Sequence, residues 1–422
     1  MRMESVGWVM PPDSRSARRG KSFGGQMHDK YMKAAARAGF EPMVTAAAGD
    51  GRKLAGLAGL AAKIGLGGRV YSLAMAARTH EPDDVEVAAR TQQLIGQSVP
   101  RWHFNMLRDE PRNAAFDAAI RRAVTPGTHV LDIGAGSGLL SMMAARAGAG
   151  RVVACEENPA IADMARQIVA TNGFADRVRV VTGNSTELDM ESDLEGRADV
   201  IVSEIVSNNL LAEGVLKTLA DAATRLLAPG GQMIPAGGDV MIALGSWAAA
   251  EDHRMTMVSG FDLGGFNALT QVPRNVAVSD ATLTLQSEPA ALLSFDFTGE
   301  AAREPHHGAA TLVAQGGPIG GIMQWIRLQL DDVIDYENRP GPDAKSHWGA
   351  QYYPFDVPLE LAAGTELRVV GVHDGHQLLV WREDAGATEL PSPSGEGLGW
   401  GCNGHPRAQH VPTPPPPLKG RG

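Results

Sequence analysis

The pattern of apolar and polar positions divides the chain into segments of different character. Between residues 96 and 235, short apolar runs alternate with stretches in which apolar residues recur every three or four positions. Short apolar runs indicate buried strands, and the spacing of three to four indicates helices. The predicted strands are 129–134, 151–156, 177–183 and 198–204, and the predicted helices are 137–149, 159–174 and 214–231, the last ending at glycines. This alternation is typical of a doubly wound parallel sheet.

The pattern changes after Pro235. Short apolar runs are now separated by Gly, Pro and Asp, which indicates antiparallel strands in a sandwich or barrel. The expected strands are 238–244, 281–287, 292–297, 325–330, 367–372 and 377–381. We therefore predict a second, all-β domain over residues 236–384.

The segment 51–95 has helical spacing and two alternative interpretations. It matches one tetratricopeptide-like repeat, with Gly65 at its turn and Pro82 at its exit. It also fits an ordinary helical hairpin docked on the next domain, because single repeats normally need neighbours to bury their faces. The expected packing positions are Leu54, Leu57, Ala61, Val70, Ala74 and Ala77.

The two ends of the chain differ in composition from the rest. Residues 1–50 are rich in Gly, Ala and Met, with a basic patch, and we expect a flexible arm. Residues 385–422 are dominated by Gly, Pro and Ser, and we expect a disordered tail.

Composition narrows the classes of partner and compartment. The formal charge of -10 and pI of about 5.7 disfavour general electrostatic binding to nucleic acid. Cys155 and Cys402 fit neither a disulfide framework nor a metal site, which indicates a reducing compartment. No apolar run reaches the roughly 18 residues of a membrane span. We therefore expect a cytoplasmic protein without a membrane partner.

A glycine-rich turn follows the first predicted strand of the parallel sheet. In "VLDIGAGSG", three glycines allow a ligand to approach the backbone closely: Gly134, Gly136 and Gly138. A dinucleotide fingerprint would need a glycine where Leu139 stands. Asp132 would repel a pyrophosphate but suits the cationic S-adenosylmethionine (AdoMet), and Glu156 is placed to accept hydrogen bonds from ribose hydroxyls. An AdoMet-dependent methyltransferase fits better than a nucleotide-binding or degenerate domain.

Two carboxylates flank the end of the fourth predicted strand. In "SEIVSNNLLAEG", Glu204 follows the strand directly and Glu213 lies nine residues later. Carboxylates that converge on one pocket repel each other unless a cation lies between them. A guanidinium fits, because it is planar, permanently charged and able to pair with two carboxylates.

These motifs resemble those of the protein arginine methyltransferases. The interval between Glu204 and Glu213 is similar to the double-glutamate loop of that family, "NMLRDEPRN" is similar to its N-terminal helix motif, and "SHWGAQYY" resembles its Thr-His-Trp loop, with Ser346 in place of Thr. The resemblance covers about residues 100–383 and is nearest to the monomethylating (type III) branch. It implies a Rossmann-like, seven-stranded AdoMet domain over 96–235, followed by a β-barrel that binds substrate.

The resemblance also implies roles for particular residues in the acceptor site. Glu204 and Glu213 would hold the substrate guanidinium, and His347 would pair with Asp109 near the active site. Trp348 would form a wall of the arginine channel. The side chain of Met106 would crowd the acceptor nitrogen and influence how many methyl groups are added.

For the cofactor, the resemblance implies a further set. Arg112 would bind the AdoMet carboxylate and help to orient Glu204. Asp132 and the three glycines would line the methionine and ribose site, and Glu156 would hold the ribose. Thr186 stands near the position at which some family members place an adenine-binding acid.

The expected acceptor is an arginine in a protein or peptide, such as an Arg/Gly-rich segment. The filling of the acceptor loop, Ser207-Asn208-Asn209, departs from the aromatic or Met residue common in the family. Two alternatives therefore stay open: an enzyme acting on a small guanidino or amino compound, and a repeat-containing adaptor with an inactive methyltransferase domain. Residues 248–267 are the candidate dimerisation arm of a homodimer.

Overall fold

A computed structural model describes residues 39–211, 214–252, 254–270, 272–298 and 306–383. The predicted tail, and most of the predicted N-terminal arm, lie outside these residues. No helix in the described part of the chain has the length and apolar character needed to cross a membrane.

The first four helices of the described chain share one apolar core. They are α2 (Phe40–Ala46), α3 (Gly51–Lys63), α4 (Gly67–His80) and α5 (Val85–Ser98). All six expected packing positions are buried, and Gly65 has a positive φ of 75° at the turn between α3 and α4. The predicted helical hairpin is present, whereas its likeness to a tetratricopeptide repeat stays a prediction.

The predicted boundaries of this helical module were too narrow. Helix α2 falls within the segment assigned to the flexible arm, and its Phe40 is 1% exposed in the helical core. Helix α5 continues to Ser98, so the module is larger than a hairpin. A helix of seven residues has too few turns to show a helical period, and the spacing of α5 was hidden by its many polar residues.

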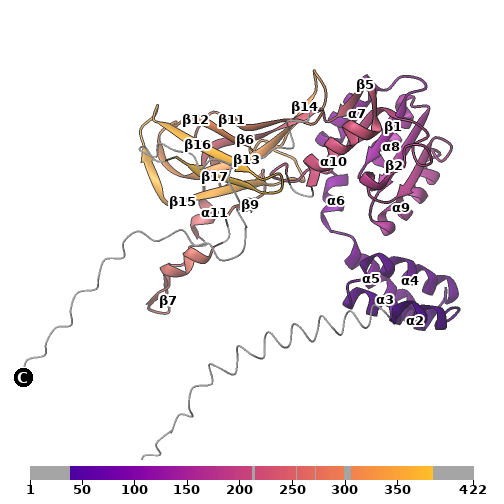
Figure 1. The fold of residues 1–422 in the computed structure, drawn as a ribbon. Helices are drawn as coiled ribbons and strands as arrows, with labels where there is room; N and C mark the ends of the chain where they lie inside the picture. The colour runs from indigo at the N-terminus through magenta and orange to yellow at the C-terminus, as the bar shows by residue number, and fades with distance from the viewer. Residues whose placement is uncertain (1–38, 212–213, 253, 271, 299–305, 384–422) are drawn as a thin grey trace, which may run out of the picture. The chain divides into compact units, whose positions relative to one another are not determined.

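The α/β region contains a parallel sheet with the strand order β3-β2-β1-β4-β5. Its strands are β1 (His129–Ile133), β2 (Arg151–Glu156), β3 (Val178–Thr182), β4 (Ala198–Ser203) and β5 (Leu227–Ile234). The helices of this region are α6 (Trp102–Leu107), α7 (Glu110–Ala123), α8 (Leu139–Ala147), α9 (Pro159–Thr171) and α10 (Val215–Asp221), with short turns of helix at Ser185–Glu187 and Ala222–Leu226 (Figure 1).

The register of this sheet brings the predicted motifs to one edge. Ile133, the last residue of β1, pairs with Cys155 on one side and with Ser203 on the other. Strands β1, β2 and β4 are parallel, so their carboxyl ends lie together. The glycine turn, Glu156 and Glu204 therefore lie at three adjacent strand ends.

The predicted helix 214–231 was wrong in its last third. The helical turns end at Leu226, and the glycines lie inside β5 instead of capping the helix. Between β4 and β5 the register moves from Ala198–Leu227 to Val200–Gln232, so the intervening residues form a bulge. Gly230 has a φ of 77° there, and a Cβ on Gly231 would lie 2.8 Å from the carbonyl oxygen of Asp199. The glycines serve this bulge.

The parallel sheet has five strands in the described part of the chain, not the seven that the family resemblance implied. After β5 the chain enters β6 (Gly237–Trp247). This strand pairs antiparallel with three later strands: β10 (Leu283–Leu285), β11 (Ala290–Asp296) and β13 (Gly317–Gln329). The long apolar strand β6 therefore does not join the parallel sheet and is instead an interior strand of the antiparallel one.

The predicted antiparallel domain is confirmed. A seven-stranded sheet has the order β10-β6-β13-β15-β9, with β11 on β6 and β14 on β13, and a three-stranded sheet has the order β12-β16-β17. The strands are β9 (Arg274–Val276), β10 (Leu283–Leu285), β11 (Ala290–Asp296), β12 (His307–Val313), β13 (Gly317–Gln329), β14 (Asp335–Glu337), β15 (Ala350–Leu361), β16 (Glu366–His373) and β17 (Leu378–Arg382).

Strands β9, β12, β14 and β15 were not predicted. Strand β15 contains Pro354 and Pro358, which argue against a strand in the sequence pattern. The structure accommodates them at a break in the ladder, where the register moves from Ile319–Leu359 to Gly321–Pro354. Strands β9 and β14 have three residues each, too few to show an alternating pattern.

An excursion leaves the antiparallel domain after β6 (Figure 1). It consists of α11 (Ala248–Asp252), the two-residue strands β7 (Met257–Val258) and β8 (Phe261–Asp262), and a turn of 3-10 helix at Gly264–Leu269. This excursion contains the candidate dimerisation arm.

Ile326 tests the role of the central strand β13, which pairs with both β6 and β15. Its side chain is fully buried. We expect Ile326→Ala to lower the free energy of unfolding by about 2–5 kcal/mol, because it removes buried methylene groups and leaves a cavity. Chemical denaturation measures this change. Val333→Ala, at a position 67% exposed, is the control and should change it by less than about 0.5 kcal/mol.

Candidate active site

A cavity of about 1140 Å³ opens at the carboxyl edge of the parallel sheet. Six of the predicted site residues line it: Met106, Gly134, Glu156, Glu204, His347 and Trp348. They come from α6, from three strand ends of the parallel sheet and from the loop that precedes β15 in the antiparallel domain. The cavity therefore brings the predicted cofactor and acceptor residues together.

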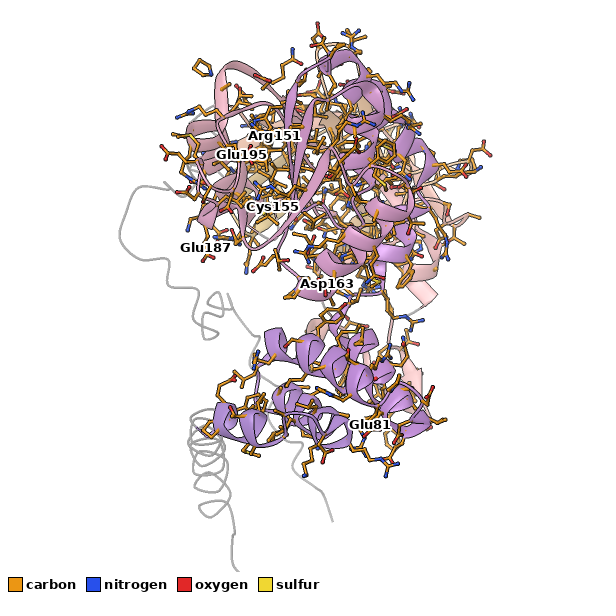
Figure 2. All side chains as sticks on the ribbon, turned by 90° about the vertical axis from the view of Figure 1, so that its right-hand side faces the viewer. Glu81, Arg151, Cys155, Asp163, Glu187 and Glu195 are labelled. Atoms are coloured by element: carbon orange, nitrogen blue, oxygen red, sulfur yellow. The ribbon has the colours of Figure 1, made fainter. Side chains whose placement is uncertain are left out.

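The glycine turn and Glu156 form one hydrogen-bonded unit. The backbone N–H groups of Gly134 and Ala135 both donate to the carbonyl of Cys155, at 3.0 Å each, which ties the turn to β2. Figure 2 labels Cys155. The carboxylate of Glu156 accepts from the backbone N–H of Gly136 at 2.9 Å and of Asn158 at 2.8 Å. This fixes a nearly buried carboxylate at the cavity wall, where it can also accept hydrogen bonds from ligand hydroxyls.

Two buried polar atoms beside the turn have no hydrogen-bond partner within the described residues. They are Oδ1 of Asp132, an acceptor, and Nε of Arg112, a donor. Buried polar atoms are normally paired, and the ammonium and carboxylate of a ligand would pair with these two. The methionine end of AdoMet carries both groups, and the residues present fit it.

Burial raises the pKa of Asp132 to about 6, although the Ser141 hydroxyl donates to its other oxygen at 2.6 Å. Asp132 does not line the cavity itself. It lies in β1 directly before Ile133, and Ile133 lines the cavity. A nearby cation would favour the ionised form of this carboxyl group.

Glu204 is held by a buried ion pair. Its Oε2 accepts a hydrogen bond from Nη2 of Arg112, and both side chains are less than 5% exposed. Arg112 also donates to Asn113, and its guanidinium lies 5.1 Å from the centroid of the Phe116 ring. Three contacts therefore fix the guanidinium that orients Glu204, which was the predicted relation between the two residues.

Asp109 connects the α/β region to the antiparallel domain. One of its oxygens accepts from the backbone N–H of His347 at 2.9 Å and lies 2.9 Å from Nδ1 of the same residue. The Tyr336 hydroxyl also donates to it at 3.2 Å. Burial alone would raise the pKa of Asp109, but the donors of His347 and the backbone N–H of Arg112 outweigh it and lower the pKa. Asp109 therefore stays ionised beside the predicted histidine.

Three further hydrogen bonds join the acceptor loop to the antiparallel domain. The indole N–H of Trp348 donates to the carbonyl of Val206 at 3.2 Å. The side-chain amide of Asn208 donates to Oδ1 of Asn275 at 3.3 Å. The backbone carbonyl of Asn208 accepts from the side-chain amide of Gln324 at 3.0 Å. The acceptor end of the cavity is thus a junction between two domains.

Two predicted site residues need separate comment. Glu213 lies outside the described residues. Thr186 is exposed and does not line the cavity; its hydroxyl donates to Asn184 at 2.7 Å. The neighbouring Asn184 and Ser185 line the cavity in its place.

Sequence reasoning missed several residues of the site, among them Tyr336, Asn275 and Gln351. Tyr336 holds Asp109 from 227 positions away in the chain, and Asn275 and Gln351 line the cavity from paired strands. No local signal marks such residues, because distant strand pairing places them: β9 with β15 for Asn275 and Gln351, and β14 with β13 for Tyr336.

Comparisons with known proteins agree with this geometry. The chain is 37% identical over 277 residues to an arginine N(omega)-methyltransferase of Streptomyces achromogenes subsp. streptozoticus, a match that covers 65% of this chain and 76% of the relative. This chain belongs to the arginine N-methyltransferase family. The predicted family, the methyltransferase class and AdoMet as methyl donor are thereby confirmed.

Other members of the family match over a smaller share of their length. The chain is 30% identical to protein arginine N-methyltransferase 7 of Drosophila grimshawi, over 68% of this chain and 47% of that relative. The chain therefore spans about half the length of this relative. Residues 117–238 also match the family described as ribosomal protein L11 methyltransferase (PrmA).

A solved structure of an arginine N-methyltransferase shares the architecture. The Trypanosoma brucei PRMT1 enzyme-prozyme heterotetrameric complex with AdoHcy is 26% identical, with a TM-score of 0.60, over 68% of this chain and 95% of that chain. Crystal structures of PRMT6 are 17–18% identical with TM-scores of 0.53 and show the fold alone.

The pKa of Asp132 predicts how cofactor affinity depends on pH. Protonation near pH 6 removes the charge that attracts the AdoMet ammonium, so AdoMet affinity should fall by up to about tenfold for each pH unit below 6. Calorimetric titrations between pH 5 and 8 measure this. The Asp132→Asn variant should bind AdoMet weakly, and its affinity should depend little on pH. An unchanged wild-type affinity between pH 7 and pH 5 would rule out this role of Asp132.

Proposed function

We propose that this chain transfers a methyl group from AdoMet to a guanidino nitrogen of arginine. One observation carries the proposal: the buried carboxylate of Glu204 lines the same cavity as the glycine turn and Glu156. A fixed carboxylate beside a cofactor site is suited to hold a planar cation. When bound, AdoMet supplies an electrophilic methyl group on a sulfonium.

Glu204 has two tasks in this proposal. It accepts hydrogen bonds from the acceptor guanidinium and so fixes the angle at which the nucleophilic nitrogen points to the methyl group. Its negative charge, with that of Glu213, draws positive charge toward the nitrogens it contacts. The attacking nitrogen is then richer in electrons, which compensates for the delocalised lone pairs of a guanidinium.

The remaining acceptor residues hold the substrate and receive the proton. Trp348 and Met106 line the cavity and restrict the space around the acceptor nitrogen. The nitrogen loses a proton after methylation, and two groups can receive it: Glu213, or His347 paired with Asp109. The ionised Asp109 would stabilise a protonated His347.

Two forms of the acceptor are compatible with the relatives. One relative is named for arginine and the other for protein arginine. Arginine in a protein or peptide is the form expected from the sequence motifs, and a small guanidino compound is the second candidate. Both place the same guanidinium at Glu204, so the proposed chemistry is the same for each.

Glu204→Gln is the direct test of this function. Glutamine keeps an oxygen that can accept from Arg112 but lacks the charge, so methyl transfer should fall by about a hundredfold or more. Transfer of labelled methyl from AdoMet to free arginine and to an Arg/Gly peptide measures the loss. Mass spectrometry of the wild-type product should show a single added methyl group on arginine.

Calorimetry provides the control for the Glu204 variant. AdoMet binding should survive, because Glu204 contacts the acceptor in this proposal. Glu187→Gln, on the exposed turn after β3, should retain full activity (Figure 2). Loss of AdoMet binding in Glu204→Gln would show that Glu204 acts in the cofactor site. Full activity of Glu204→Gln would exclude the proposed role of Glu204 in holding the acceptor guanidinium.

We also propose that the excursion after β6 mediates homodimer formation. Its apolar side chains are unusually exposed for a folded chain: Met257 63%, Phe261 72%, Phe266 65% and Leu269 75%. Contiguous exposed apolar residues mark interaction surfaces, because covering them stabilises an assembly by about 25 cal/mol per Å².

Sedimentation velocity tests the dimer. The wild-type chain should sediment as a dimer at micromolar concentration, and the double variant Phe261→Asp, Phe266→Asp should sediment as a monomer because it places charges in the apolar contact. Val333→Asp, an equally exposed position elsewhere, should remain dimeric. A wild-type monomer at every concentration would refute the proposal.

A further inference from the structure

A second cavity of about 590 Å³ adjoins the acceptor end of the main one. The two cavities share four lining residues: Asn208, Asn275, His347 and Trp348. Two of them, His347 and Trp348, belong to the loop before β15 that lines the acceptor end of the main cavity. An arginine with its guanidinium at Glu204 can therefore direct its main-chain end toward this second cavity.

Charged groups of both signs line the second cavity. Arg108 and Lys345 are exposed cations, and neither has an ion pair within the described part of the chain. Glu110 is an exposed carboxylate on the same wall. The other acid, Asp109, is buried and accepts hydrogen bonds from His347, Tyr336 and the backbone of Arg112. The accessible groups are thus two cations and one anion.

Amide side chains also line the second cavity. Asn208 is fixed by its hydrogen bonds to Asn275 and Gln324, and Asn105 lines the second cavity from α6. Amides offer both donors and acceptors, so they suit a ligand that has both kinds of group. Asn208 belongs to the Ser207-Asn208-Asn209 filling that departs from the family pattern.

We propose that the second cavity recognises the α-carboxylate and α-ammonium of free arginine, with Arg108 and Lys345 contacting the carboxylate. This inference rests on the proposed function and names its acceptor. An arginine inside a peptide carries neither main-chain charge, and the neighbouring arginines of an Arg/Gly-rich segment would be repelled by Arg108 and Lys345. The relative of which this chain covers 76% is named for arginine, whereas relatives named for protein arginine are covered over 36–48% of their length.

A series of acceptors tests the proposal on the wild-type chain. The series comprises L-arginine, arginine amide, agmatine, an Arg/Gly peptide, and the same peptide with glutamates beside the arginine. We expect kcat/KM for L-arginine to exceed that for agmatine and arginine amide at least tenfold, since both lack the carboxylate. Equal values for L-arginine and agmatine would overturn the proposal.

Variants of the two cations test the residues. Arg108→Ala and Lys345→Ala should each raise KM for L-arginine about tenfold, with kcat changed less than twofold, and should leave the kinetics with agmatine unchanged. Lys63→Ala, an exposed lysine of the helical module, is the matched control and should behave as wild type. Equal losses with L-arginine and agmatine would show a structural effect and would overturn the assignment.

The outcomes separate this inference from the function on which it rests. Methylation of peptides without methylation of L-arginine would overturn the inference and leave the proposed function intact. Preference for the glutamate-flanked peptide over L-arginine would place a side-chain carboxylate in the cavity and would also overturn it. No methylation of any acceptor, with AdoMet binding intact, would contradict the proposed function itself.

Discussion

The buried ion pair between Arg112 and Glu204 is the interaction on which the rest of the site depends. Two charges removed from water are costly, and they are tolerated only when each is well paired. Here α7 supplies the cation and the end of β4 supplies the anion, so the pair locks a helix to the cofactor edge of the sheet. The pair also fixes Glu204 at the wall of the main cavity, where the guanidinium of the proposed acceptor can bind to it. In the function we propose, Arg112 thus acts on the acceptor through Glu204, which it orients.

A second constraint joins the two domains around the acceptor. Asp109 is held by His347 and Tyr336, and Trp348 donates to the carbonyl of Val206 beside the acceptor loop. These bonds cross from the antiparallel domain to the α/β region, so neither domain forms the site alone. The polar second cavity lies at the same junction, which makes the junction a natural place for selection among acceptors.

The sequence predicted most of what depends on local chemistry. Apolar runs located four strands of the parallel sheet, and the glycine turn, Glu156 and Glu204 could be placed because each lies at a strand end. Three other features could not be predicted, because they depend on pairing with distant strands. They are the number of strands in that sheet, the bulge at Gly230 and Gly231, and the strand β15 with its two prolines. For the same reason Tyr336 and Asn275 were missed, and Thr186 was expected where its neighbours Asn184 and Ser185 line the cavity.

A crystal structure of the ternary complex with AdoHcy and L-arginine is the most direct test of the central claim that Glu204 positions the acceptor. The account predicts the arginine guanidinium within hydrogen-bond distance of Glu204, with the Arg112–Glu204 pair intact. A guanidinium bound elsewhere, or Glu204 turned away from the cavity, would contradict it.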